Sequence, residues 1–408
     1  MTKKSDAPAI RFKGFSDAWE QRKLGEMMNV TSVKRIHQSD WTDSGVRFLR
    51  ARDIVAAAKN EEPDDYLYIS KEKYEEYSAL SGKVGVSDLL VTGVGTIGVP
   101  YLVRNLEPLY FKDGNIIWFQ NSGKIDGKFL FYSFSAEQIQ GFINESAGIG
   151  TVGTYTIESG KKTPISLPNQ IEQARVGEFF QQLDNLITLH QRKFEKLTNV
   201  KKSMLEKMFP QNGSSYPEIR FKGFTDPWEQ RKAKELFIST ADKGYPDLPV
   251  LSATQDRGMI RRDENSINIF HDKKNEAGYK RVLPGQFVIH LRSFQGGFAH
   301  STIEGITSPA YTVFGFSEPE KHDSEYWKYV FTSKAFIRRL ETVTYGIRDG
   351  RSISYDEFLT LGFAYPSKAE QTAIARYLDK LSDLITLHQR ELEMLQNIKK
   401  SMLEKMFV

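Results

Sequence analysis

The chain has 408 residues, of which 39% are hydrophobic and 12% aromatic. This composition excludes a disordered chain, and the length predicts two to four domains with cores of their own. Lys and Arg number 56 against 52 Asp and Glu, so the net charge is only +4 and any nucleic-acid binding must come from local basic patches. The absence of cysteine excludes disulfides, thiolate zinc sites and a cysteine nucleophile. With no apolar signal segment near residue 1, we expect a cytoplasmic protein.

Two tandem copies of one unit make up the sequence. Residues 10–23 (IRFKGFSDAWEQRK) and 219–232 (IRFKGFTDPWEQRK) are near-identical and are called the heads. LITLHQR and KKSMLEKMF each occur twice, at 186–209 and 384–407, within segments called the tails. The heads begin 209 residues apart and the tails 198 apart, so the first of the two intervening bodies is 11 residues longer. Because heads and tails are kept while the bodies diverge, we infer that the tails meet the same partner twice, or each other, and that the bodies meet two different ligands.

Each head is predicted to open a short helix. Asp226 suits the N-cap, Pro227 the first helical position and Glu229 the capping box, and Asp17 with Glu20 repeats this pattern.

Each body is predicted to be a compact α+β domain of about 150 residues. Gly, aromatic and β-branched residues predict short strands, followed by one helical stretch and one Gly-rich segment. The predicted strands lie in 46–55, 82–95, 101–111 and 114–120, and in 281–293 and 310–317; the helical stretches are 127–145 and 323–343, and the Gly-rich segments 146–168 and 344–366.

The tails, about 171–208 and 369–406, are predicted to be long helices that pack on each other. Apolar residues recur at alternating spacings of four and three, which is a heptad seam. A helix of about 38 residues is roughly 57 Å long. Leu186, Leu189, Val200 and Leu205 widen the apolar stripe and leave surface for a further partner. The seam residues are Leu183, Ile187, His190, Phe194, Leu197 and Met204 in the first tail, and Leu381, Ile385, His388, Leu392, Leu395 and Met402 in the second.

Polar residues recur at matching places in the two seams. His190 matches His388, and Lys201 matches Lys399. They either fix the register of the helix pair or lie at the edge of the stripe with their charged ends in water.

The chain resembles the DNA-specificity subunit of type I restriction–modification enzymes. The resemblance rests on the duplicated heads, on the Pro-x-x-x-Glu-Gln entries to the tails, and on the twin helices. The entry residues are Pro168, Glu172 and Gln173 in the first copy, and Pro366, Glu370 and Gln371 in the second.

The resemblance implies an α+β fold with two tandem target recognition domains, at 1–168 and 211–366. Each is followed by a spacer helix, at 169–210 and 367–408, and the two helices pair as an antiparallel coiled coil with pseudo-twofold symmetry. Each domain is expected to read one half of a bipartite site in double-stranded DNA.

The resemblance also implies partners. Two adenine-methylating subunits that use S-adenosylmethionine, and restriction subunits that use ATP and Mg, are expected to carry the chemistry, with no cofactor or metal on this chain. The sequence agrees, because it contains neither a G-x-x-x-x-G-K-[ST] phosphate loop nor the Pro-Pro of an adenine-methylation motif.

Two short motifs resemble sites of other protein classes, a dinucleotide-binding site and a nuclease site. GVGTIG at 93–98 matches a dinucleotide fingerprint, but a strand-like run follows it, so we predict a turn with positive φ that brings Thr96 near phosphate. Asp247 with Asp272-Lys273-Lys274 resembles a metal-dependent nuclease site, in the second copy only.

Basic residues in strands and Gly-rich loops are the candidates for DNA contact. Arg reads guanine in the major groove, and Lys and Arg also pair with phosphates, whereas any one of them could equally be a solvated surface charge. The candidates are Arg47, Arg50, Arg52, Thr96, Lys161 and Lys162 in the first body, and Arg257, Arg261, Arg262, Arg292, Ser293, Gln295, Arg348 and Arg351 in the second.

The leading prediction is therefore a non-catalytic DNA-binding specificity subunit. The alternatives are a stand-alone metal-dependent nuclease or methyltransferase, which the missing motifs disfavour, and a coiled-coil scaffold with two protein-binding heads.

Overall fold

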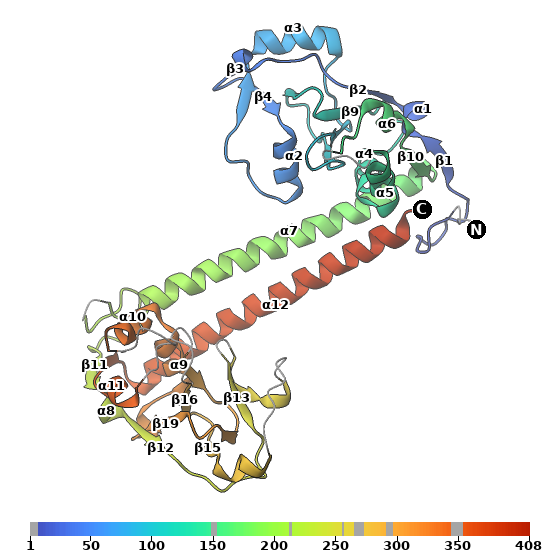
Figure 1. Ribbon diagram of the computed structural model, residues 1–408. Helices are drawn as coiled ribbons and strands as arrows, with labels where there is room; N and C mark the ends of the chain where they lie inside the picture. Colours follow the sequence, from blue (N-terminus) through green and yellow to red (C-terminus); the bar gives the residue numbers. More distant parts are fainter. Residues whose placement is uncertain are drawn as a thin grey trace. The chain divides into compact units, whose positions relative to one another are not determined.

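The computed structural model describes residues 7–147, 153–211, 214–254, 257–264, 273–290, 297–343 and 354–408 (Figure 1). It divides the chain into two compact units, residues 1–191 with 389–408, and residues 192–388. Each unit therefore holds one body, the start of that body's own tail and the end of the other copy's tail. The division into four domains remains a prediction, because both units cut through the tails.

The first body contains two four-stranded sheets with strand orders β2-β9-β6-β7 and β3-β5-β4-β8. The first sheet packs against α4 and α5, and the core that they share extends onto the tails. The elements are β1 (Glu20–Lys23), α1 (Leu24–Met27), β2 (Asn29–Thr31), the 3-10 turn η1 (Gln38–Asp40), β3 (Trp41–Thr42), β4 (Val46–Leu49), α2 (Ala51–Ala58), β5 (Leu67–Ile69), α3 (Lys71–Ser81), β6 (Leu89–Thr92), β7 (Pro100–Leu102), β8 (Leu109–Phe111), β9 (Ile116–Gln120), α4 (Gly127–Ser135), α5 (Glu137–Ser146), α6 (Ile157–Lys162) and β10 (Pro164–Leu167).

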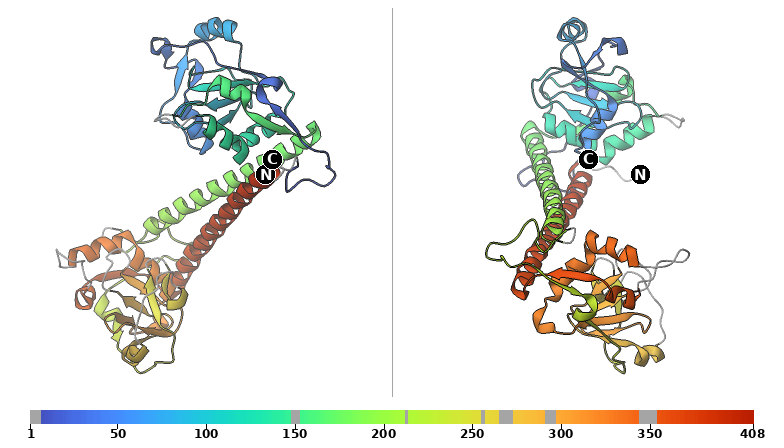
Figure 2. Two further views of the ribbon diagram at one scale, coloured as in Figure 1. Left: turned by 45° about the vertical axis from the view of Figure 1, so that its right-hand side comes forward. Right: turned by 90° about the vertical axis from the view of Figure 1, so that its left-hand side faces the viewer.

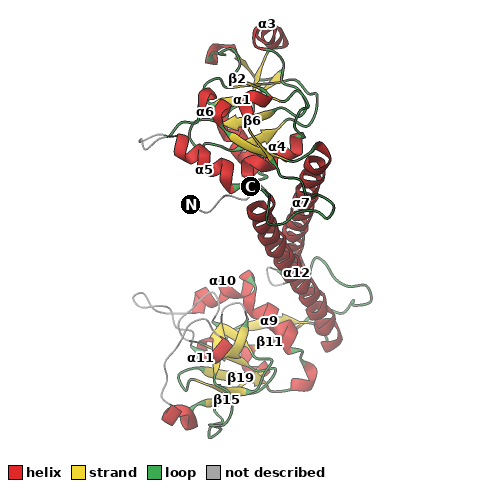
Figure 3. Cartoon of the chain, turned by 90° about the vertical axis from the view of Figure 1, so that its right-hand side faces the viewer, coloured by secondary structure: helices red, strands yellow, loops and turns green. Residues whose placement is uncertain are grey.

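The second body repeats the first sheet as β12-β19-β16-β17, and in place of the second sheet it has two two-stranded sheets, the hairpin β13-β14 and the antiparallel pair β15-β18. Its strands and helices are drawn in Figure 3. Its elements are β11 (Glu229–Lys232), α8 (Ala233–Leu236), β12 (Phe237–Thr240), β13 (Leu251–Thr254), β14 (Gly258–Arg261), η2 (Arg262–Glu264), η3 (Lys273–Gly278), β15 (Lys280–Val282), β16 (Phe287–Ile289), β17 (Phe298–His300), β18 (Gly305–Thr307), β19 (Thr312–Phe316), η4 (Pro319–Lys321), α9 (Ser324–Thr332), α10 (Lys334–Val343), α11 (Tyr355–Leu359) and β20 (Gly362–Tyr365).

The tails form helices α7 (Gln170–Lys207) and α12 (Lys368–Met406), close to the predicted length. They pack antiparallel in both units (Figure 1 and the left view of Figure 2). In the first unit, Phe180 of α7 contacts Phe407, which directly follows α12, and Asp184 of α7 contacts Lys399 of α12, so the numbers run in opposite directions. In the second unit, Met208 at the end of α7 shares a core with Ile374 and Leu378 near the start of α12. The antiparallel coiled coil is thus confirmed.

The head does not begin as a helix, so that prediction was wrong. Residues 20–23 and 229–232 are strands that pair with β10 and β20, the strands leading into the tails. Trp19 and Trp228, just before these strands, are buried in the two cores. Pairing with a distant strand outweighed the local capping pattern, which spans only a few residues.

Two other local predictions also needed correction. Residues 51–55 of the expected strand 46–55 belong to α2, because Asp53 accepts from the Arg50 backbone N–H and closes a capping box. Each predicted helical stretch is two helices, separated at Ala136 and at Ser333. Helix α3 was not predicted.

The repeated heads and tail entries meet in a buried ion pair. The Arg11 guanidinium forms two hydrogen bonds with the Glu172 carboxylate, of 2.6 and 2.7 Å, and Arg220 contacts Glu370 in the same way at 2.7 Å. Both carboxylates are almost fully buried. A two-pronged contact of this kind fixes orientation, so the head is held against the first turn of its own tail.

The glutamine of each entry fixes the body to the same turn. Gln173 accepts a hydrogen bond from the Asp126 backbone N–H at the start of α4 and donates to the Pro168 carbonyl. Gln371 makes the equivalent contacts with Asp323 and Pro366. The Pro-x-x-x-Glu-Gln motif is therefore a structural joint between body and tail.

The end of the first tail packs against the second head, and the end of the second tail packs against the first head. The Ile219 N–H donates to the Lys207 carbonyl, and the Ile10 N–H donates to the Lys405 carbonyl, both at 2.9 Å. The first body is thus completed by residues almost 400 positions away.

Candidate nucleic-acid interface and its mounting

The GVGTIG segment forms the turn between β6 and β7, as predicted. Gly95 and Gly98 both have φ of +77°, and Thr96 lies exposed at the tip. Gly93 has no room for a side chain, since a Cβ there would lie 2.6 Å from the Tyr155 carbonyl oxygen. The segment leads into a strand and not into a helix, so it lacks the context of a dinucleotide fingerprint.

The second body has an equivalent turn between β16 and β17. These strands occupy the same places in their sheet as β6 and β7 do in theirs. The His290 N–H donates to the Gly297 carbonyl at 3.0 Å and closes the base of the turn. Arg292, Ser293 and Gln295 fall between these strands in the sequence and lie outside the described residues. The two sets of candidates therefore connect equivalent pairs of strands, although the two connecting segments share no sequence motif.

A Gly-rich segment runs beside the first turn. The Gln140 side chain on α5 donates to the Gly98 carbonyl at 2.9 Å, and a Cβ on Gly153 would lie 3.9 Å from Ile97. The corresponding segment after α10 contains Arg348 and Arg351, both outside the described residues. In the first body the β6–β7 turn thus lies beside α5 and Gly153.

The three arginines of β4 and α2 are partly used inside the protein. Arg50 pairs with Asp53 at 3.0 Å and with Asp65 at 2.9 Å, and Arg52 also contacts Asp65. The hydrogen bonds from Arg50 lower the pKa of the Asp65 carboxyl. Arg47 instead stacks on the Tyr66 ring at 3.8 Å. Arg50 and Arg52 would have to exchange these carboxylates for phosphate in order to bind DNA.

Lys161 and Lys162 end helix α6. Lys161 pairs with Glu158 at 2.9 Å and lines a polar hollow together with Asn29, Lys83 and Lys124. Lys162 is exposed.

The basic residues of the β13–β14 hairpin differ in their surroundings. Arg257 and Arg261 are exposed, whereas Nε and Nη1 of Arg262 are buried without a hydrogen-bond partner among the described residues. Asp272 of the nuclease-like pattern lies outside those residues, so no carboxylate pair can be assigned to it.

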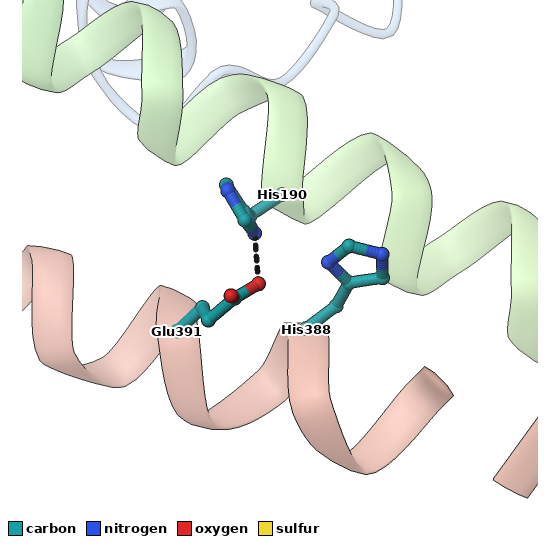
Figure 4. Close-up of side chains that lie close together, drawn as sticks. All are labelled: His190, His388 and Glu391. Atoms are coloured by element: carbon teal, nitrogen blue, oxygen red, sulfur yellow. Dashed lines mark ion pairs between the residues drawn. The ribbon is translucent and has the colours of Figure 1, made fainter. Parts of the chain in front are cut away.

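All the predicted seam residues, named above, are buried or half-buried. Leu186 and Leu189, which flank the first seam, remain 44% and 46% exposed. His190 is half-buried, and its Nδ1 lies 2.9 Å from a Glu391 carboxylate oxygen on the facing helix (Figure 4). Position 190 of α7 therefore faces position 391 of α12, which agrees with a role in register.

Asp184 of α7 attaches the first body to the helix pair, and the sequence did not predict this role. One carboxylate oxygen of Asp184 accepts from the Tyr132 hydroxyl of α4 at 2.6 Å, and the other lies 2.6 Å from Lys399 of α12. Burial, followed by this hydrogen bond, raises the pKa of the Tyr132 hydroxyl. Body, first tail and second tail thus converge on one carboxylate.

The second body uses a different carboxylate. Tyr329 and Lys328 of α9 both contact Asp379 at 2.6 Å, one turn earlier along the tail than the equivalent of Asp184. That equivalent is Ser382, which lies 3.3 Å from the Tyr329 hydroxyl. Lys201 lies over the Tyr329 ring as Lys399 lies over Tyr132, but no ion pair is recorded for it among the described residues. Burial, and then the charge of Lys328, lower the pKa of Lys201.

Replacing Ser382 with aspartate is expected to stabilise the second unit by about 1 kcal/mol at pH 7, the range of a partly exposed ion pair. The pKa of Lys201 is lower in the folded state than in the unfolded chain, so its charge destabilises the fold at neutral pH, and this cost disappears as pH rises through both values. The gain from S382D should therefore shrink near pH 11. Urea unfolding at the two pH values measures it, and an equal gain at both would contradict the assignment.

No helix among the described residues is long and apolar enough to cross a membrane. Part of the chain matches a known protein family. Residues 16–199 match the family described as the type I restriction modification DNA specificity domain.

Two curated relatives match over part of their length. The type I restriction enzyme MjaVIII specificity subunit of Methanocaldococcus jannaschii is 28% identical over 200 residues, 46% of this chain and 44% of the relative. A putative type I restriction enzyme specificity subunit of Haemophilus influenzae, S.HindORF215P, is 29% identical over 170 residues, 40% and 41% of the two chains. The matches thus span less than half of each relative.

One solved structure shares the whole fold. The crystal structure of a type I restriction–modification S subunit from M. genitalium superposes with a TM-score of 0.60 at 13% identity, covering 98% of this chain and 99% of that one.

Proposed function

We propose that the chain is a type I restriction–modification DNA specificity subunit, the non-catalytic subunit that reads a bipartite DNA site. One observation carries the proposal. The two bodies share a sheet order and an identical joint to the tails, but differ in sequence at the equivalent β6–β7 and β16–β17 turns. A DNA site whose two halves differ in sequence requires two recognition domains that differ in their turns but are attached to the tails in the same way.

The chemistry of the turns suits DNA. Gly95 and Thr96 expose backbone and hydroxyl groups that reach phosphate, and Arg292, Ser293 and Gln295 offer side chains that pair with base edges. We propose that the paired helices serve as the spacer between the half-sites, since half-sites about 34–36 Å apart require a rigid element of comparable length.

The helix pair offers a surface to partners. In the heptad frame set by the seam, Leu186, Leu189, Met394 and Ile398 fall on the g and c positions, and in an antiparallel pair these lie on the same side. All four are exposed. We propose that this face, and its repeat in the second unit, receives two methylation subunits that use S-adenosylmethionine. Restriction subunits that use ATP and Mg would join the same cytoplasmic complex.

Mapping methylated adenines in cells with and without this gene tests the proposal. We expect one bipartite motif that disappears with the gene. An unchanged pattern would favour the protein-binding scaffold instead.

A finer test uses one substitution in each body. Thr96→Ala should relax the letters of one half-site, and Gln295→Ala those of the other, because each turn reads its own half. The control Glu393→Gln, on an exposed face of α12, should leave the motif intact. Loss of both half-sites in either body variant would contradict separate readers.

A further inference from the structure

The joints between body and tail cannot distinguish the two copies. The Arg11–Glu172 contact and its counterpart Arg220–Glu370 are chemically the same, and so are the glutamine contacts one residue later. By these contacts alone, either body would seat on the start of either tail. Tandem repeats of such similarity are prone to exchange segments between chains during folding.

The contacts one to three turns further along differ between the copies. Asp126 and Asp323 start α4 and α9 at equivalent joints, so positions 128, 131 and 132 match 325, 328 and 329. By the same argument, Gln173 and Gln371 align tail positions 178, 181 and 184 with 376, 379 and 382. On the body side these are Lys, Phe and Tyr in the first copy and Glu, Lys and Tyr in the second; on the tail side they are Glu, Gln and Asp, and Arg, Asp and Ser.

In the first copy these residues are matched in charge. Lys128 lies 2.5 Å from Glu178, and both side chains are about half exposed. The Tyr132 hydroxyl donates to Asp184. The basic partner is therefore on the body and the acidic partners are on the tail.

The second copy is matched differently. Lys328 pairs with Asp379, at the position where the first copy has Phe131 and Gln181, both of which contact Arg104 of the first body. Glu325 takes the position of Lys128, and Arg376 that of Glu178. The charge pattern at this first position is reversed.

Exchanging the bodies would bring like charges together. The first body on the second tail would set Lys128 against Arg376, and it would place Asp379 where Gln181 now accepts a hydrogen bond from Arg104. The second body on the first tail would set Glu325 against Glu178. Repulsive contacts of this kind discriminate between partners that otherwise bind equally well.

We propose that these residues form a copy-specific docking pattern that keeps each body on its own tail. They are Lys128, Phe131, Glu178, Gln181 and Asp184, with their counterparts Glu325, Lys328, Arg376, Asp379 and Ser382. The pattern favours each body on a tail of its own copy over a tail of the other copy, independently of what the bodies bind.

Refolding of the full chain tests this proposal. Two preparations with different tags are unfolded together and refolded by dilution, and mixed species are captured by one tag and detected by the other. The variant E178R/Q181D/D184S gives the first tail the docking residues of the second. Compared with the wild type, we expect a lower unfolding midpoint and about tenfold more mixed species, the ratio that corresponds to about 1.4 kcal/mol of lost discrimination.

Adding K128E and F131K to that variant separates discrimination from stability. The first body then matches its altered tail, so the midpoint should recover most of the loss. Both copies now carry one pattern, so mixed species should stay high. A merely structural role predicts that mixing falls back as stability returns, and that result would overturn the proposal.

The matched control is Glu393→Arg, which changes net charge by the same +2 at an exposed position whose recorded partner, Gln389, is on its own helix. It should refold like the wild type. If the triple variant also refolds like the wild type, with an unchanged midpoint and no added mixing, the docking pattern is refuted.

Discussion

Replacing Arg11 with methionine is expected to lower the free energy of unfolding of the first unit by about 3–5 kcal/mol. The Glu172 carboxylate has no exposed side-chain surface, and Arg11 is only 12% exposed. Removing the arginine leaves a buried carboxylate without its counter-charge, which costs far more than the pair itself contributes.

The chain contains its own controls for this experiment. Arg220→Met should produce the same loss in the second unit, through Glu370. Arg22→Met removes an exposed pair with Glu20 and should cost about 1 kcal/mol or less. The double variant R11M/E172L should be more stable than R11M, because an apolar pair replaces an isolated charge. Chemical unfolding followed by hydrogen exchange assigns each loss to its unit, and a loss for R11M no larger than that for R22M would refute the buried lock.

Replacing Phe407 with alanine is expected to destabilise the N-terminal body, although the residue lies at the far end of the sequence. Its ring contacts Trp19, Phe129 and Phe180, with centroids 6.3, 5.5 and 5.7 Å away. Removing a core phenylalanine costs about 3–5 kcal/mol, and since Phe407 is only half-buried we expect about 2–3 kcal/mol.

Hydrogen exchange should show the loss of protection in β1, β10 and α4 and leave the second body unchanged. Phe209→Ala, which removes the equivalent ring against Trp228 and Tyr326, should do the reverse. Met394→Ala on an exposed face of α12 is the control and should have little effect. Equal effects of F407A on both bodies would contradict the assignment of residues 389–408 to the first unit.

Long-range sequence patterns predicted more of this protein than short ones did. The heptad spacing predicted both tails within one or two residues of α7 and α12, because a pattern sustained over nearly four heptads averages out local exceptions. The capping signals of the heads were misleading, because residues 20–23 lie beside β10, about 145 positions later. Contacts at that separation leave no periodic trace in the sequence.

The candidate site divides in a similar way. The glycines at 93–98 predicted a turn with positive φ, since such a backbone favours glycine whatever surrounds it. The equivalence of that turn with the β16–β17 turn required the strand order of both sheets. The mounting role of Asp184 was also hidden, because its partners come from α4 and α12 and only folding brings them together.

By itself the sequence determined that the protein is a duplication with constant heads and tails and divergent bodies, and that its tails are paired helices. These properties follow from repeats and from periodicity, and both can be recognised in the sequence without a three-dimensional structure. The tertiary structure decided what the constant residues do. Arg11, Glu172 and Gln173 recur because they join head, body and tail, and the last turn of α12 recurs because it completes the first body. Such roles depend on which distant groups share a buried, desolvated contact, and only the folded chain creates those contacts.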